Sequence, residues 1–415
     1  MRVLWRCSGG VYTPLYGMLT RIVIVPGLNQ MRGEAWTANR KLCVSLLKDL
    51  GFAKTATEGR MMEEFRHVAE SVAHTNGKPV NTLQYVAPCV FNNVVSFFYG
   101  DQLKHDNWTV RKLHRLMVQL VGALFRGRVQ HYLPWRLRRL LVRIPFTQSH
   151  EVADMLAELD AVSAKQVQQS KAAKSGDDTK GFIHGYIKKI EESRDESVPL
   201  ITDGYLVGNV NVFLMGGTIT LTATLMWHML NFARNPDTVQ ARVQREIDEV
   251  VGDQRLPTWE DRKQMPYTVA CIWELFRWRT VAPLGVSRAC AADVVVGDFF
   301  IPKDAILLAN IWAVHNDPTL WREPNKFMPE RHLDEEGRLV SQKPEYVLPF
   351  AIGRRDCPGQ TFATMEIFFL ITFLLQKYRI VPEHPIELDL DSPGTPLSYA
   401  NNVKLRFLPR KSSKD

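Results

Sequence analysis

Apolar residues recur at helical spacing through most of the first three quarters of the chain. Intervals of three and four residues place them on one side of a helix, which predicts amphipathic helices with one buried face. A helix start signal, Asn235-Pro236, stands just before the second of the two clearest stripes. These two stripes are Met61, Phe65, Val68 and Val72, and Val239, Val243, Ile247 and Val250.

The longest apolar segment runs from Gly204 to Leu230. Its length and composition predict a buried core helix, although it contains Gly216, Gly217 and four threonines. Adjacent glycines cost a helix up to about 1 kcal/mol each, so the close approach of a ligand is a functional reason for them. No run of 18 or more apolar residues occurs, so no membrane-spanning helix is evident.

After residue 280 the pattern changes to short β-type runs, broken by turn residues such as Gly297-Asp298. The runs are 294–296, 299–301 and 306–308. Helical spacing returns over 359–377, and the tail from 378 to 408 has the pattern of strands and turns. The chain is therefore predicted to be mainly α, a large helical domain with small β-sheets.

The composition narrows the choice of partners and compartment. The chain has 415 residues, a formal net charge of +8 and a pI of about 9.1. A basic balance favours acidic partners: a membrane surface, an acidic protein or nucleic acid. The cysteines are dispersed, with no C-x-x-C pair and no histidine tract, which favours a reducing compartment and argues against a zinc site. They are Cys7, Cys43, Cys89, Cys271, Cys290 and Cys357.

One cysteine stands in a distinctive setting. Residues 350–359 read FAIGRRDCPG and precede a long apolar run. Alone, a cysteine is most often a small buried apolar residue. Cys357, however, lies in a glycine-bounded bend before a predicted helix, where backbone N–H groups and the helix dipole favour a thiolate. Such a thiolate suits the axial ligand of a haem iron, and the nearby Arg355 can offer a planar fork to a propionate.

This segment resembles, position by position, the haem-binding loop of the cytochrome P-450 family, Phe-x-x-Gly-x-Arg-x-Cys-x-Gly. Fixed residues at fixed spacing make the signal specific. Glu274 and Arg277, at i and i+3, and Arg331 in the FMPER segment resemble further motifs of the family. Spacing alone fits an ordinary exposed ion pair of Glu274 with Arg277. The resemblance implies instead a buried structural network of all three behind the haem.

The order of motifs, and the segment IWAVHNDP at 311–318, are most similar to the microsomal, drug- and steroid-oxidising clan of animals. The resemblance implies haem b as cofactor, with Cys357 as the axial ligand of the iron. The residues implied to surround the haem and its propionates are Phe350, Gly353, Arg355, Gly359, Trp36, Arg40 and Arg288.

The resemblance also implies the distal side of the haem. Gly216, Gly217 and Thr220 match the oxygen-binding groove, so we expect them to take part in catalysis. Ile219 stands where the family places an acidic residue, which puts the delivery of protons to oxygen in question. The residues expected to line an apolar substrate pocket are Phe213, Met215, Val281, Ala282, Pro283 and Leu284.

The activity implied is a monooxygenase that inserts one atom of O2 into a xenobiotic, a steroid or a fatty acid. Electrons would come from NADPH through a flavoprotein reductase, with cytochrome b5 as a further partner, on the cytosolic face of the endoplasmic reticulum membrane. Two alternatives stay open. Ile219 motivates a reductase-independent isomerase or dehydratase, and the unusual N-terminus motivates a degenerate, non-catalytic haem-binding protein.

The two ends of the resemblance carry separate expectations. Residues 1–28 do not fit the family's anchor and first sheet, so we expect an atypical segment there, a truncated N-terminus and a P-450 domain over 29–415. Residues 126–143, RGRVQHYLPWRLRRLLVR, mix arginines with aromatic and aliphatic residues. A nucleic-acid patch lacks a base-reading motif, so we favour peripheral membrane contact and expect no nucleic acid.

Overall fold

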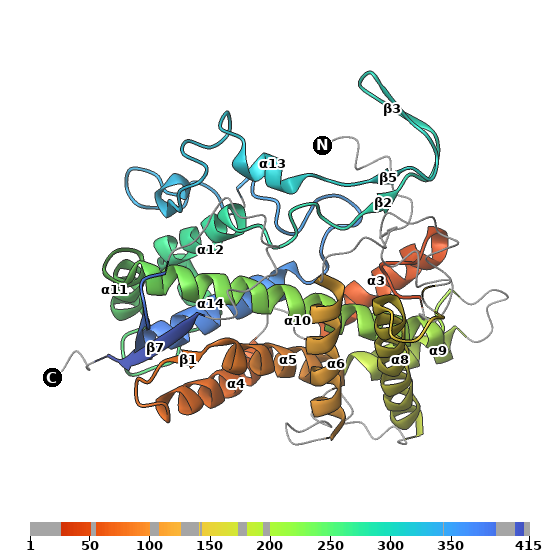
Figure 1. Cartoon of the computed structure of the whole chain (residues 1–415), viewed down its shortest axis with the longest axis horizontal. Coiled ribbons are helices and arrows are strands. Elements are labelled where there is room, and N and C mark those ends of the chain that lie inside the picture. Colours follow the sequence, from red (N-terminus) through yellow and green to blue (C-terminus); the bar gives the residue numbers. More distant parts are fainter. Residues whose placement is uncertain are drawn as a thin grey trace.

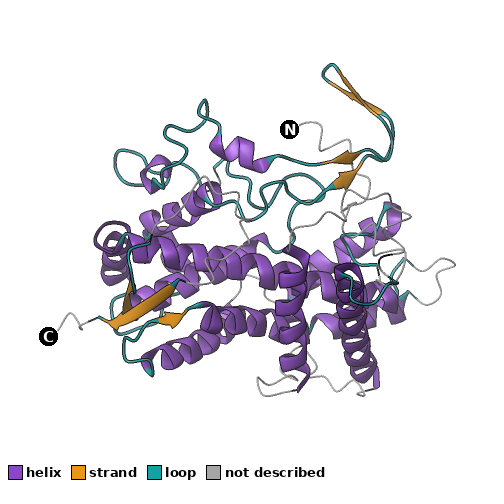
Figure 2. Cartoon of the chain, in the orientation of Figure 1, coloured by secondary structure: helices purple, strands orange, loops and turns teal. Residues whose placement is uncertain are grey.

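A computed structural model of the chain describes most of its residues. The described residues are 26–50, 55–99, 108–125, 141, 143–172, 181–193, 200–342, 344–386 and 403–410. They form a mainly helical body with a few short antiparallel strands, as Figure 2 shows. The predicted fold class is therefore confirmed.

The helices carry most of the described chain (Figure 1). They are α3 (Gly33–Asp49), α4 (Thr55–Ala73), α5 (Leu83–Tyr99), α6 (Trp108–Phe125), α8 (Gln148–Ala172), α9 (Phe182–Glu192), α10 (Asp203–Arg234), α11 (Ala241–Val250), α12 (Pro266–Trp278), α13 (Ile311–Asn316) and α14 (Gln360–Lys377). Shorter helical turns cover Pro236–Gln240, Trp259–Gln264 and Pro329–His332.

The long helix α10 is the centre of the body. Its N-terminus is capped by Thr202, whose side chain accepts a hydrogen bond from the backbone N–H of Tyr205 at 3.3 Å. Helices α5, α8, α9, α12 and α14 pack around it, so most of its surface is buried. Among the described helices, α10 alone is long and apolar enough to cross a membrane, but its burial identifies it as the predicted core helix.

The strands form three small sheets. The sheet near the C-terminus has the order β1 (Val80–Asn81), β7 (Lys404–Pro409), β6 (Tyr378–Pro382). The other two sheets are hairpin-like pairs, β2 (Arg288–Ala289) with β5 (Ile306–Leu307), and β3 (Val294–Val296) with β4 (Phe299–Ile301). Gly297, at φ 57°, supplies the left-handed residue of the tight β3–β4 turn.

The structure bears out the sequence pattern at most of the predicted elements. All four residues of the first stripe are buried in α4, and Val243 and Ile247 are buried in α11. The predicted β-type runs become β3, β4 and β5, and the predicted helix over 359–377 is α14. Residues 1–25, and 126–140 with 142 of the basic segment, lie outside the described residues, so the expectations placed on them stay predictions.

Candidate haem site

The loop that carries Cys357 is held by its own backbone. Cys357 N–H donates to the carbonyl of Phe350 at 2.9 Å, and Asp356 N–H donates to that of Gly353 at 3.0 Å. Gly353 has φ 86°, a left-handed conformation that glycine adopts without strain. Helix α14 begins at Gln360, directly after the loop, so its free N-terminal N–H groups lie near the cysteine.

Cys357 is the only one of the five described cysteines that is exposed. Desolvation by the surrounding protein nevertheless raises the pKa of its thiol, while a backbone hydrogen bond from Gly359 acts in the opposite direction. The expected thiolate would therefore have to be stabilised by a bound cation such as a metal ion.

Trp36 and a group of arginines surround this loop. The Arg355 guanidinium stacks over the Trp36 ring at 3.8 Å from its centroid, and that of Arg354 lies 5.6 Å from it. Arg40 makes an ion pair with Asp356, a residue that the sequence analysis did not single out. The Nη2 atom of Arg288 donates to the carbonyl of Arg355 at 3.4 Å. Residues from α3, β2 and the loop thus meet beside Cys357.

The Arg355 guanidinium uses its two terminal nitrogens to bind backbone carbonyls, and its Nε donor is not used. Its Nη1 and Nη2 atoms donate to the carbonyls of Leu28 and Met31, at 3.0 and 2.9 Å. Its Nε atom is buried and has no partner among the residues that the structure describes. Desolvation, followed by the charges of the neighbouring arginines, lowers its pKa to about 9. This cluster therefore carries an excess of positive charge that a dianionic ligand would relieve.

Behind the loop, a buried network is built around Glu274. Its carboxylate accepts from Arg277 Nη2 at 2.7 Å and from Arg331 Nε at 3.0 Å. It also accepts from the backbone N–H of Met328 at 3.0 Å and bonds the ring of His332 at 3.1 Å. Desolvation alone would raise the pKa of Glu274, but these hydrogen bonds and charges lower it. The sequence interpretation of a buried network, rather than an exposed ion pair, fits this geometry.

Two histidines extend this network and were missed by the sequence analysis. His332 bonds Glu274 directly. His315 accepts from the backbone N–H of Leu348 through Nε2 at 2.8 Å, and its Nδ1 lies 2.6 Å from the hydroxyl of Thr280. Its carbonyl accepts from Arg277 at 2.7 Å. The only sequence signal for these histidines was their position inside the segments IWAVHNDP and FMPERH.

On the other side of the loop, α10 presents one accessible stripe. From Leu206 to Arg234 nearly every residue is buried. The exceptions are Val212, Gly216, Gly217, Thr220, Trp227 and Arg234. Apart from Gly217, their spacings of four and seven residues place them on a single helical face. The predicted catalytic positions Gly216 and Thr220 both belong to this stripe.

The two adjacent glycines have different surroundings. A Cβ atom on Gly216 would meet nothing within 4 Å, so this position faces open space. A Cβ atom on Gly217 would lie 3.1 Å from a methyl group of Val94 in α5, so this glycine allows close helix packing. Thr220 donates from its hydroxyl to the carbonyl of Gly216 at 2.5 Å. The geometry therefore favours a ligand-facing role for Gly216 and a packing role for Gly217.

The predicted pocket residues also divide into two groups. Phe213 and Met215 are both 9% exposed, and Phe213 stacks on Phe98 with ring centroids 5.1 Å apart, as a core residue would. The turn after α12 is more open, with Leu284 47% exposed. Only this turn, Val281–Leu284, is accessible enough to meet a substrate without rearrangement of the core.

Comparison with known proteins agrees with this arrangement. The sequence profile of the family described as Cytochrome P450 matches residues 21–401. The chain belongs to the cytochrome P450 family. It is 31% identical to cytochrome P450 2U1 of Bos taurus over 84% of this chain and 63% of the relative. Human cytochrome P450 2U1 is 30% identical over 85% of this chain and 64% of the relative. Human cytochrome P450 2J2 is 28% identical over 91% of this chain and 74% of the relative.

This P450 chain thus spans less than two thirds of the length of the 2U1 relatives that it matches. The microsomal animal proteins among its relatives agree with the clan to which the sequence motifs pointed. The described residues fit a haem, because an accessible thiol lies in a loop surrounded by an excess of arginines, and Gly216 of α10 has an open side.

Proposed function

We propose that this P450 is a haem-dependent monooxygenase that inserts one atom of O2 into a lipophilic substrate. The observation that carries the proposal is the accessible Cys357 thiol beside a cluster of arginines. When bound, haem b supplies the activation of O2, so that one oxygen atom enters the substrate and the other leaves as water with two electrons and two protons.

The residues divide the work of holding the haem. Cys357 would provide a thiolate ligand to the haem iron, and Phe350, Gly353 and Gly359 would shape the loop around it. Arg40, Arg288 and Arg355 would bind the propionates. Arg355 keeps its Nε donor after binding two backbone carbonyls, whereas Arg40 also pairs with Asp356. The ring of Trp36 makes cation–π contacts with Arg355 and Arg40 and so helps to position them.

On the substrate side, Thr220 has the hydroxyl closest in position to the family's oxygen-binding threonine. It donates to the Gly216 carbonyl at 2.5 Å and is exposed, so its oxygen can accept a hydrogen bond from water and hold a proton near the reacting face. Ile219 is only 9% exposed and supplies no carboxylate. Proton delivery therefore rests on Thr220 and ordered water.

Electrons come from NADPH through a flavoprotein reductase. Arg354 and Lys41 are exposed near the Cys357 loop and give this surface a positive charge that suits an acidic partner, cytochrome b5 included. The similar microsomal proteins support a place at the cytosolic face of the endoplasmic reticulum membrane. We keep the division into an atypical segment 1–28 and a P450 domain 29–415, and membrane contact by residues 126–143, as parts of this proposal.

The test is oxygen incorporation by the haem-loaded protein under ¹⁸O2. With NADPH and reductase, a medium-chain fatty acid or a steroid should gain a single ¹⁸O atom, and Cys357→Ala should abolish the product. Product formed without NADPH or reductase would instead support the isomerase or dehydratase alternative. Haem-loaded protein that converts none of a broad panel of lipophilic probes would overturn the monooxygenase proposal.

A further inference from the structure

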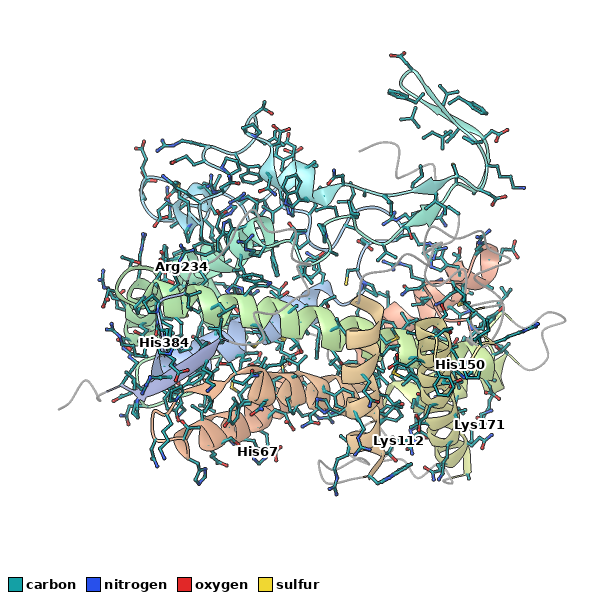
Figure 3. All side chains as sticks on the ribbon, in the orientation of Figure 1. His67, Lys112, His150, Lys171, Arg234 and His384 are labelled. Atoms are coloured by element: carbon teal, nitrogen blue, oxygen red, sulfur yellow. The ribbon has the colours of Figure 1, made fainter. Side chains whose placement is uncertain are left out.

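An unusual arginine lies at the C-terminal end of the accessible stripe of α10. The guanidinium carbon of Arg279 lies 4.3 Å from the ring centroid of Trp278 and 4.9 Å from that of Trp227. Trp227 belongs to the stripe, and Arg234 ends it, as the labelled residue at the end of α10 in Figure 3 shows. Arg279 therefore packs against Trp227 of α10 and Trp278 of α12, and the charge of Arg234 reaches it.

Among the residues that the structure describes, these arginines have no counter-ion. Within the described part of the chain, neither Arg279 nor Arg234 makes a salt bridge or a side-chain hydrogen bond, and the Nε atom of Arg279 is buried without a partner. Burial, and then the charge of Arg234, lowers the pKa of Arg279 to about 10. The tryptophan faces offset part of the cost of burying this charge, but they provide no acceptor for its N–H groups.

The helix C-termini stabilise the positive charge of the two arginines only in part. Both arginines lie near the C-terminus of a helix, where partial negative charge favours a cation. Among the described contacts, neither guanidinium donates to the terminal carbonyls, and the Nε atom of Arg279 has no acceptor. An anion with two oxygen atoms, such as a carboxylate, matches the fork of Arg279.

The place of this pair relates it to the proposed oxidation site. Trp227 follows Thr220 by seven residues, so the two share a helical face and lie ~10 Å apart along the axis. Arg279 stands two residues before Val281, where the accessible apolar turn begins. A cationic end and an apolar wall therefore border the same stripe, with Thr220 farther along it.

We infer that Arg279, assisted by Arg234, binds the carboxylate of an amphipathic acid whose apolar chain lies along α10 toward Thr220. This inference rests on the proposed function, since it names the substrate class of that site. It makes Arg279 a residue that determines specificity and leaves the oxidation chemistry itself unchanged.

The experiment measures binding of radiolabelled dodecanoic acid and of dodecan-1-ol to the haem-loaded protein by equilibrium dialysis. Arg279→Gln should weaken binding of the acid by about tenfold to a hundredfold, the value of a charge-assisted hydrogen bond. It should leave binding of the alcohol within about twofold. Arg234→Gln should show a smaller loss for the acid, because Arg234 is exposed.

Matched variants separate recognition from structure. Arg338→Gln removes an exposed arginine that pairs with Asp334 and Glu336 on another loop, and it should change neither ligand's affinity. Arg279→Lys keeps the charge and should restore part of the acid affinity. Equal losses for acid and alcohol in Arg279→Gln, or no loss for either, would overturn the inference and leave Arg279 as a clamp between two tryptophans.

Failure of this inference is distinguishable from failure of the proposed function. Dialysis needs neither electrons nor oxygen. Acid binding that depends on Arg279, without oxygen insertion under ¹⁸O2, would reject the monooxygenase proposal alone. Oxygen insertion into neutral substrates, with acid binding indifferent to Arg279, would reject the carboxylate site alone.

Discussion

The network behind Cys357 and the accessible stripe of α10 treat polar groups in opposite ways. Around Glu274, arginine, histidine and backbone donors converge on one carboxylate that is fully buried. Along α10, the Thr220 hydroxyl donates to a carbonyl of its own helix. At the end of α12, the Arg279 guanidinium has no polar partner among the described residues. Saturated polar groups fix one arrangement, whereas unsaturated ones are available to a ligand.

The largest loss of stability should follow from breaking the hydrogen-bonded network around Glu274. Arg277→Ala leaves the buried Glu274 carboxylate without its bidentate partner, and removing one member of a buried ion pair costs about 3 to 5 kcal/mol. We expect the variant to unfold at much lower denaturant, as measured by far-UV circular dichroism. Arg234→Ala, at the end of the accessible stripe of α10, should change the free energy of unfolding by no more than about 0.5 kcal/mol.

The contrast fails if both variants lose stability equally. Glu274→Gln is a useful second measurement, because it keeps the volume and removes only the charge. It should still destabilise the protein, since Arg277 would then be a buried cation without its anion.

The two glycines of α10 offer a sharper comparison within one helix. Gly217→Ala brings a methyl group within 3.1 Å of Val94, so we expect a loss of about 1 to 3 kcal/mol from overpacking. Gly216→Ala meets nothing within 4 Å and should raise helix stability by about 0.5 to 1 kcal/mol. Thermal unfolding of both variants in parallel measures the difference.

The ligand-facing assignment of Gly216 adds a second readout. If the open side of Gly216 is where haem or substrate lies, the stabilised Gly216→Ala variant should bind a lipophilic probe more weakly. An unchanged affinity in a stably folded variant would show that this open side is not part of the site.

Two buried histidines carry the comparison into pH dependence. Burial lowers the pKa of His228, in α10, to about 3, and that of His315, in the network, to about 4. Both are neutral in the folded protein, whereas the unfolded chain binds their protons below about pH 6.5. Stability should therefore fall as pH decreases from about 6.5 toward these values, by at most ~1.4 kcal/mol per pH unit for each histidine.

Substitution should separate the two histidines. Neither ring nitrogen of His228 has a partner in the described part of the chain, so His228→Leu should be neutral or stabilising and should reduce the dependence of stability on pH. His315→Leu should destabilise at every pH, because it deprives Leu348 N–H of its acceptor. Equal effects of the two substitutions in urea titrations at several pH values would contradict the distinction.

Sequence patterns were enough for the elements that repeat or that match a motif. The stripes of α4 and α11, the β3–β4 pair and the Cys357 loop all follow from local spacing, which a single chain displays directly. The burial of Glu274 with Arg277 was implied by resemblance rather than by spacing, since an exposed pair has the same spacing. His332, His315 and Asp356 were missed because their partners lie far away in sequence.

The residues expected on the distal side of the haem also show what local sequence cannot predict. Phe213 matched a pocket position, yet it packs among Phe98 and Phe182. Gly217 was grouped with Gly216, and only the approach of α5 separates them. Arg279 had no sequence signal, because its tryptophan neighbours come from two helices that meet only in the folded protein.

The central claim is that Cys357 provides a thiolate to haem iron, and the reduced, carbon-monoxide-bound absorption spectrum tests it most directly. The haem-loaded protein should show a Soret band displaced far to the red. Cys357→Ala should lose that displaced band, while Cys290→Ala, which removes a buried cysteine elsewhere, should keep it. A displaced band that survives Cys357→Ala, or an undisplaced band in the parent protein, would contradict the account.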